Sequence, residues 1–154
     1  MNRYEESGLD NVWLMNGFHV ANTPYGEAVS IEDVDGLHRL IAQSLIKKRA
    51  PLEGAELRFL RIEIGLSQLS LAALLGEQEQ DVGNWEQAKD KPLRGPVDRL
   101  VRMIYSNAMD DDPRFGELID LLTETEDQLA RTEQALRFER KGSHWAEAVV
   151  AEVA

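Results

Sequence analysis

The chain has 154 residues, of which 43% are hydrophobic, and its formal net charge at pH 7 is −11. This length supports one hydrophobic core with small extensions, and the absence of cysteine excludes disulfides and thiolate metal sites. The acidic excess argues against a general nucleic-acid binder, because non-specific affinity depends on Lys and Arg side chains that neutralise phosphates.

The beginning of the chain predicts a small antiparallel sheet. Two short apolar runs, residues 12–15 and 18–20, flank Asn16 and Gly17, and Asn-Gly between such runs favours a two-residue hairpin turn. Residues 23–26 (TPYG) predict a second turn, after which residues 28–31 are expected to add a third strand. Because isolated hairpins are marginal in water, we expect this sheet to lean on a helix.

A helix is predicted next, capped by Ser30 or Asp33 and running to about residue 48. Its apolar residues recur at helical spacing and are expected to cover the sheet: Ile31, Val34, Leu37, Ile41 and Leu45. His38 lies beside this stripe. With only His19 and His144 elsewhere and no cysteine, we expect no metal site.

Residues 54–95 carry the clearest functional signal. Residues 65–76 read GLSQLSLAALLG, and Trp85 and Glu86 follow nine residues later. Ser67 suits the N-cap of a helix that begins at residue 68, and Gly76 permits a sharp turn after it. The flanking helices are expected at about residues 55–64 and 78–87, and the last of them would bury Val82 and Trp85. Two short helices joined by a tight turn form a helix-turn-helix.

These residues resemble the Cro and lambda-repressor (XRE) family of helix-turn-helix domains, which carry similar GLSQ, LAxxLG and WE sequences, over about residues 52–105. The resemblance implies a structural ion pair between Arg61 and Glu86. It further implies contacts to DNA bases from Gln78, Glu79, Gln80, Gly83 and Asn84. Contacts to DNA phosphates would come from Ser67, Gln68, Lys89, Lys91 and Arg94.

The same segment has an unusual charge for a DNA-reading helix. Residues 77–87 contain Glu77, Glu79, Asp81 and Glu86 and no Lys or Arg. A carboxylate that faces DNA repels phosphates, although a well-placed one accepts a hydrogen bond from cytosine N4. The alternative is therefore a helix-turn-helix that is kept for its packing alone.

The last third of the chain predicts more helix. Gly95 and Pro96 open a helix to about residue 107, and residues 109–113 predict a solvated linker. From Arg114 to Arg140 a heptad-like stripe predicts a long amphipathic helix, either a dimer seam or a helix packed on its own domain. The proposed dimerisation residues are Phe115, Leu118, Leu122, Leu129 and Leu136. Residues 143–154 are expected to form a short apolar helix or to fray.

We therefore expect a mostly α protein in three parts: a hairpin or three-stranded unit plus helix (1–50), a five-helix-type helix-turn-helix domain (51–108) and a helical extension (109–154). Charge follows this division. Residues 1–36 carry one basic and seven acidic residues, a net −6, whereas residues 37–61 carry six basic and two acidic residues, a net +4. A basic patch on an acidic body is compatible with selective DNA binding.

The N-terminal sequence ahead of this segment resembles small regulators of the antitoxin type, such as HigA and MqsA, although the zinc-binding cysteines of MqsA are missing. The resemblance implies a dimeric repressor of its own operon with a toxin as possible partner. The alternatives are a toxin-neutralising interaction module in which the helix-turn-helix is scaffold, and a phage-type repressor without a toxin. We expect no enzyme and no cofactor, because no catalytic motif is present. Without a signal peptide or an apolar span, a cytoplasmic location away from membranes is expected.

Overall fold

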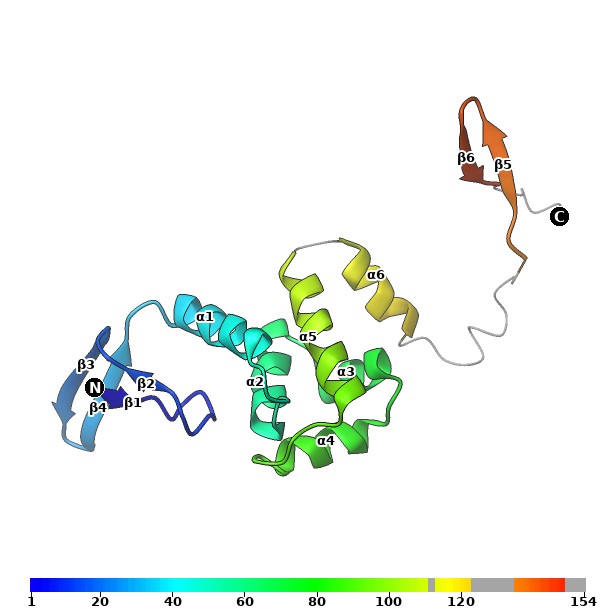
Figure 1. The fold of residues 1–154 in the computed structure, drawn as a ribbon. Helices are drawn as coiled ribbons and strands as arrows, with labels where there is room; N and C mark the ends of the chain where they lie inside the picture. Colours follow the sequence, from blue (N-terminus) through cyan, green and yellow to red (C-terminus); the bar gives the residue numbers. More distant parts are fainter. Residues whose placement is uncertain (111–112, 123–134, 149–154) are drawn as a thin grey trace. The chain divides into compact units, whose positions relative to one another are not determined.

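A computed structural model of the protein describes residues 1–110, 113–122 and 135–148. These residues are mostly helical, with small antiparallel sheets (Figure 1). The chain divides into two compact units, residues 1–123 and 124–154. Across the parts of the chain that are described, none of the helices has both the length and the apolar character needed to cross a membrane.

Over its described residues, the first unit contains four strands followed by six helices. The strands form two separate antiparallel pairs, β1 (Asn2–Arg3) with β2 (Trp13–Leu14) and β3 (Phe18–Thr23) with β4 (Gly26–Ile31). The helices are α1 (Val34–Lys47), α2 (Gly54–Ile64), α3 (Gln68–Leu75), α4 (Glu79–Gln87), α5 (Gly95–Met109) and α6 (Pro113–Leu122).

The hairpin turn predicted at Asn16 and Gly17 is wrong. Residues 13–14 pair backwards with residues 2–3, whereas β3 pairs with β4 over six residues each, in a separate sheet. The longer register outweighs the local Asn-Gly preference because each added cross-strand pair stabilises the hairpin. The turn predicted at residues 23–26 is present, and the Thr23 hydroxyl donates to the Gly26 carbonyl at 2.7 Å.

Helix α1 begins after Asp33, whose carboxylate accepts the Gly36 N–H at 3.1 Å. The expectation that its apolar face covers the sheet is wrong. Ala42 and Leu45 are buried in one core with residues of α2 and α5, while most of β3 and β4 stays exposed. A two-stranded sheet offers too little surface to compete with the helical core for these side chains.

The core of the first unit lies among α2, α3, α4 and α5. Its largest fully buried side chains come from these helices and the segment before α2: Leu52, Leu57, Leu60, Leu71, Val82 and Val101. Each such side chain contributes about 1.5–3 kcal/mol on leaving water. This shared core fixes α3 and α4 against α2.

The long helix predicted from Arg114 to Arg140 is wrong. Its last residues lie in the strand Phe138–Lys141 instead. The described part of helix α6 covers Pro113–Leu122, and Leu129 lies outside the described residues. In the second unit β5 (Phe138–Lys141) pairs with β6 (His144–Glu147), so the helix expected from residue 143 is also wrong. Gly142 has a left-handed φ of 59° that suits the turn, and the Arg140 guanidinium lies 5.5 Å from the centre of the Trp145 ring.

Candidate nucleic-acid interface

Helices α3 and α4 are joined by three residues. Ser67 caps α3, since its hydroxyl accepts the Ser70 N–H at 3.0 Å. Gly76 ends α3 with a left-handed φ of 68°, a conformation that glycine adopts at little cost. Leu71, Ala72 and Val82 are buried, so the two helices meet through small and branched apolar side chains. The predicted bounds of both helices agree with the structure to within about one residue.

The structure brings Arg61 and Glu86 together in a bidentate ion pair, with N···O distances of 2.7 and 2.8 Å. Arg61 also donates to the Leu66 carbonyl, and the Gln68 amide donates to Glu86 at 3.3 Å. Hydrogen bonding to Glu86 raises the pKa of Arg61 above its ordinary value, so this side chain stays charged. One ion pair therefore ties α2, α3 and α4 together.

The acidic residues around α4 are largely occupied by partners inside the protein. Glu77 forms an ion pair with Arg94, and the Asp81 carboxylate accepts the Gln78 N–H at 3.1 Å at the start of the helix. Glu86 is held by Arg61. Of these four acids, Glu79 and Asp81 form no ion pair in the described part of the chain, although Asp81 accepts a backbone N–H. The negative charge on α4 that no cation pairs with is thus carried by exposed Glu79 and half-buried Asp81.

The outer face of α4 is polar. Four of the residues expected to face bases are exposed: Gln78, Glu79, Gln80 and Asn84. Gly83 is half-buried instead, and a Cβ built on it would lie 3.6 Å from the Gln68 side-chain oxygen. Gln68, expected to hold a phosphate, is itself half-buried between Gly83 and Glu86.

The loop after α4 is held by the first turn of α2. The N–H of Ala55 donates to the Lys89 carbonyl at 3.0 Å, and the N–H of Gly54 donates to the Lys91 carbonyl at 3.3 Å. Leu93 N–H then donates to the Leu52 carbonyl at 2.8 Å. These bonds satisfy helix N–H groups that lack intrahelical partners. This ladder joins residues 34 to 41 positions apart and could not be predicted, because no side-chain pattern encodes it.

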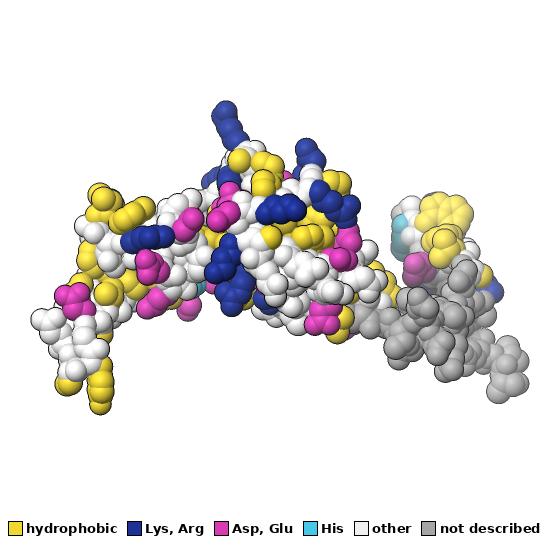
Figure 2. All heavy atoms as spheres, turned by 90° about the horizontal axis from the view of Figure 1, so that it is seen from below, with side chains coloured by type: hydrophobic (Ala, Val, Ile, Leu, Met, Phe, Trp, Pro, Cys, Tyr) yellow, Lys and Arg dark blue, Asp and Glu magenta, His cyan; other side chains and the backbone are white. Residues whose placement is uncertain are grey.

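Lys89 and Lys91 are exposed on this fixed loop, and neither has an ion-pair partner among the residues that the structure describes. A hollow of about 310 Å³ lies between the end of α4 and the loop, and Asn84, Lys91 and Arg94 are among its lining residues. Figure 2 views the helical part from the side on which α4 lies in Figure 1, and Lys and Arg side chains project from this face. Of the residues expected to contact DNA, this hollow thus brings together Asn84, Lys91 and Arg94.

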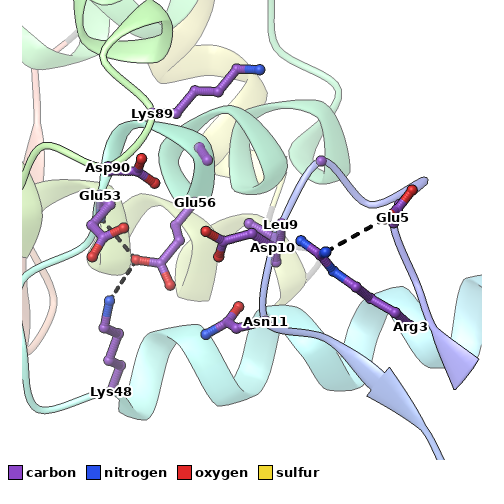
Figure 3. Close-up of a pocket in the computed structure, with 12 residues that line it drawn as sticks. Arg3, Glu5, Leu9, Asp10, Asn11, Lys48, Glu53, Glu56, Lys89 and Asp90 are labelled. Carbon is purple, nitrogen blue, oxygen red and sulfur yellow. Dashed lines mark hydrogen bonds and ion pairs between the residues drawn. The ribbon is translucent and has the colours of Figure 1, made fainter. Parts of the chain in front are cut away.

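A second hollow, of about 560 Å³, is lined by Lys89 and Asp90 of the same loop and by residues of the N-terminal segment (Figure 3). Arg3 pairs with Glu5 there at 3.6 Å, and Lys48 pairs with buried Glu56 at 2.7 Å. Figure 3 shows Lys89 pointing away from the acids of this hollow. Five acids and three bases line it, so it is a poor place for a phosphate.

His38 has a structural place. Its Nε2 lies 2.7 Å from the Tyr4 hydroxyl, its Nδ1 lies 2.9 Å from Glu63, and its ring contacts Phe59 edge to face. Burial is the main cause that raises the pKa of Tyr4, so this hydroxyl keeps its proton. Through these contacts His38 of α1 joins the N-terminal segment at Tyr4 to α2 at Phe59 and Glu63. Within the described residues, no group of three or more His, Cys, Asp or Glu side chains is arranged to hold a metal ion.

The residues expected to form a dimer seam do not share one helix. Phe115 packs against the core, whereas Leu118 and Leu122 are exposed on α6. Leu136 is exposed outside any helix, in the second unit. Any helical seam is therefore confined to α6 among the described residues.

Comparison with known proteins gave no match to a family model, to a curated protein or to a solved structure. The functional argument therefore rests on the contacts and charges described above.

Proposed function

We propose that the protein binds double-stranded DNA in a sequence-specific manner, with α3 and α4 acting as a helix-turn-helix of the Cro and lambda-repressor type. Helix α4 would enter the major groove, where Gln and Asn side chains pair with base edges. The observation that carries this proposal is how the acidic side chains around α4 are bound within the protein. Glu77 and Glu86 are paired with arginines, Asp81 accepts a backbone N–H at the start of α4, and Gln80 and Asn84 are exposed on the outer face of the helix.

Affinity for the DNA backbone would come from basic side chains beside α4. Lys89 and Lys91 lie on a loop whose backbone is fixed by α2, so their charges need little ordering on binding DNA. The net charge of the whole chain, −11, disfavours binding to random DNA. We infer a dimeric repressor that binds a palindrome in the promoter of its own gene, as an antitoxin of a toxin–antitoxin operon does.

The test is a footprint of the full-length protein on the DNA upstream of its own gene. Gln80→Ala and Asn84→Ala are each expected to weaken specific binding by about 1–3 kcal/mol per lost base contact while non-specific binding changes little. Gln87→Ala is the matched control, because Gln87 is exposed at the end of α4 and has no assigned contact. Specific binding that survives both Gln80→Ala and Asn84→Ala unchanged would remove α4 as the recognition helix.

A second candidate function is the binding of a basic protein through the N-terminal unit. The cross-strand pairs Phe18–Ile31 and Val20–Val29 put apolar side chains on one face of the β3–β4 hairpin, and Val20 is 52% exposed. The surrounding residues 1–36 have a net charge of −6. Co-purification with the product of the neighbouring gene, lost on Val20→Glu but kept in Gln80→Ala, would support this function and separate it from DNA binding.

A further inference from the structure

A hollow of about 500 Å³ lies between α1 and α5. This volume is in the range of sites that enclose small organic molecules, about 300–1,000 Å³. Six of its lining residues matter for what it can hold: Arg39, Gln43, Ile46, Lys47, Tyr105 and Met109.

Tyr105 supplies a buried polar group without a partner. Its side chain lines the hollow, the residue is 4% exposed, and its hydroxyl makes no hydrogen bond within the described structure. Burial is the main cause that raises the pKa of Tyr105, with Glu63 adding to the effect and Arg39 opposing it. The hydroxyl therefore keeps its proton and is a donor that lacks an acceptor. Buried polar groups nearly always find a partner, so this one points to a ligand.

The charge of the hollow selects the kind of acceptor. Arg39, Gln43 and Lys47 follow one another at intervals of four residues and so lie on one side of α1. Arg39 and Lys47 form no ion pair with any described residue. Asp110 is the one acid among the lining residues, so the hollow is net positive in a chain of net charge −11. Guanidinium and ammonium groups bind carboxylate and phosphate oxygens.

The hollow also has apolar walls and a fixed frame. Ile46 and Met109 line it from opposite helices. Below them Arg102 of α5 donates to the carbonyls of Ile46 and Ala50 at 3.1 and 2.8 Å and is itself paired with Asp98. These bonds hold the C-terminal end of α1 on α5, so the site exists before a ligand arrives and little ordering is required on binding.

We propose that this hollow binds a small organic anion with an apolar body, either a carboxylate or a phosphate monoester. The anionic head accepts hydrogen bonds from Arg39, Lys47 and the Tyr105 hydroxyl. The body rests on Ile46 and Met109. The assignment does not depend on the DNA-binding function of α4.

The test titrates the full-length protein with benzoate and with phenyl phosphate, followed by amide chemical shifts and calorimetry. We expect saturable binding that shifts the signals of α1 and α5, and the tighter of the two probes identifies the head group. Tyr105→Phe and Arg39→Gln are each expected to weaken binding at least tenfold, as loss of a hydrogen bond to a charged group does. Arg99→Gln removes one positive charge from α5 outside the hollow and should leave binding unchanged.

Two controls keep the proposal falsifiable. Benzamide, which has the same shape as benzoate without its charge, should bind at least tenfold more weakly, and equal binding would refute an anion site. Because the Tyr105 hydroxyl has no partner, Tyr105→Phe should melt at the same temperature as the parent protein or higher. A clear fall would mean that the hydroxyl is bonded within the protein, and the proposal would be overturned. The proposal would also be overturned if neither anion bound saturably. The same holds if a DNA duplex protected Arg39 and neither anion did.

Discussion

Arg61 and Arg94 each pair with a glutamate, but their surroundings differ. The Arg61 side chain is 14% exposed and that of Glu86 is 4% exposed, whereas the Arg94 side chain is 61% exposed. A buried ion pair is costly to break because the remaining charge has neither water nor a partner. An exposed pair gains little, since water screens both charges.

Arg61→Ala is accordingly expected to lower the free energy of unfolding by about 3–5 kcal/mol. Arg94→Ala, which removes the same side chain from an exposed pair, should lower it by about 0–1 kcal/mol. Urea denaturation followed by circular dichroism measures both. Equal losses would show that the Arg61 pair has no special role in holding α2, α3 and α4 together.

At the scale of elements, the contact between α3 and α4 has room for a side chain at its glycine, whereas the contact between α2 and α4 has none. A Cβ on Gly83 would meet the Gln68 oxygen at 3.6 Å, an ordinary contact. A Cβ on Gly54 would lie 2.0 Å from the Trp85 carbonyl oxygen, which is backbone and cannot turn aside. Close packing therefore requires glycine at position 54 but not at position 83.

Gly83→Ala is expected to raise the free energy of unfolding by about 0.5–1 kcal/mol, because alanine favours a helix interior over glycine. Gly54→Ala should lower it by about 3 kcal/mol through overpacking. Thermal and urea unfolding check both values. A Gly83→Ala protein that is more stable yet binds DNA more weakly would show that this glycine is kept for the approach of DNA to α4, whereas a less stable one would contradict the open contact.

The loop after α4 makes a separate prediction. In the double variant Lys89→Gln/Lys91→Gln the slope of log K against log salt concentration should become shallower by about 1.8, because two phosphate contacts are lost. Arg58→Gln/Arg99→Gln is the control, since it removes the same charge from exposed positions on α2 and α5. An unchanged slope in the first variant, measured by fluorescence anisotropy from low to high salt, would take this loop out of the interface.

The sequence predicts the helices of residues 54–109 well because their signals are local. Ser67 is a cap, Gly65 and Gly76 end helices in the left-handed conformation, and each helix has its own apolar stripe. The positions of Gln78, Glu79, Gln80 and Asn84 on an exposed face follow from the same periodicity. The role of Glu77 could not be predicted, because its ion pair with Arg94 depends on where the chain returns in space. The Asp81 cap is a local contact, three residues from Gln78.

The sheets were predicted less well. Asn16 and Gly17 have the composition of a hairpin turn, but strand pairing also depends on the register between strands. β3 pairs over six residues with β4, which follows it in the chain, rather than with residues 13–14 before it. In the second unit the apolar spacing through Leu136 favoured a helix. The pair Gly142 and Ser143 between Phe138 and Trp145 was the available sign of a hairpin, since Gly-Ser suits a two-residue turn.

At the scale of the whole molecule, α6 presents a group of exposed leucines among the described residues. It packs against α3, and Leu118, Leu121 and Leu122 are 45%, 49% and 41% exposed. A dimer that reads two half-sites needs a face on each copy that buries such side chains. Confined to one ten-residue helix, this face predicts a modest dimer that DNA binding would reinforce.

Leu118→Lys/Leu122→Lys is expected to raise the dissociation constant of the dimer at least tenfold, because charges replace side chains that the dimer buries. The circular dichroism spectrum should stay the same. Glu117→Lys on the same helix changes the net charge by the same amount and serves as control. Sedimentation that shows equal association in all three proteins would place the dimer surface elsewhere.

The ladder between residues 52–55 and the loop after α4 has a consequence for synthesis of the chain. The first N–H groups of α2 obtain their acceptors from Lys89 and Lys91, and Leu52 obtains its partner from Leu93. On the ribosome α2 leaves the exit tunnel before these acceptors do. Its first turn therefore remains incomplete until Leu93 has emerged, and α2, α3 and α4 reach their final arrangement together rather than one after another.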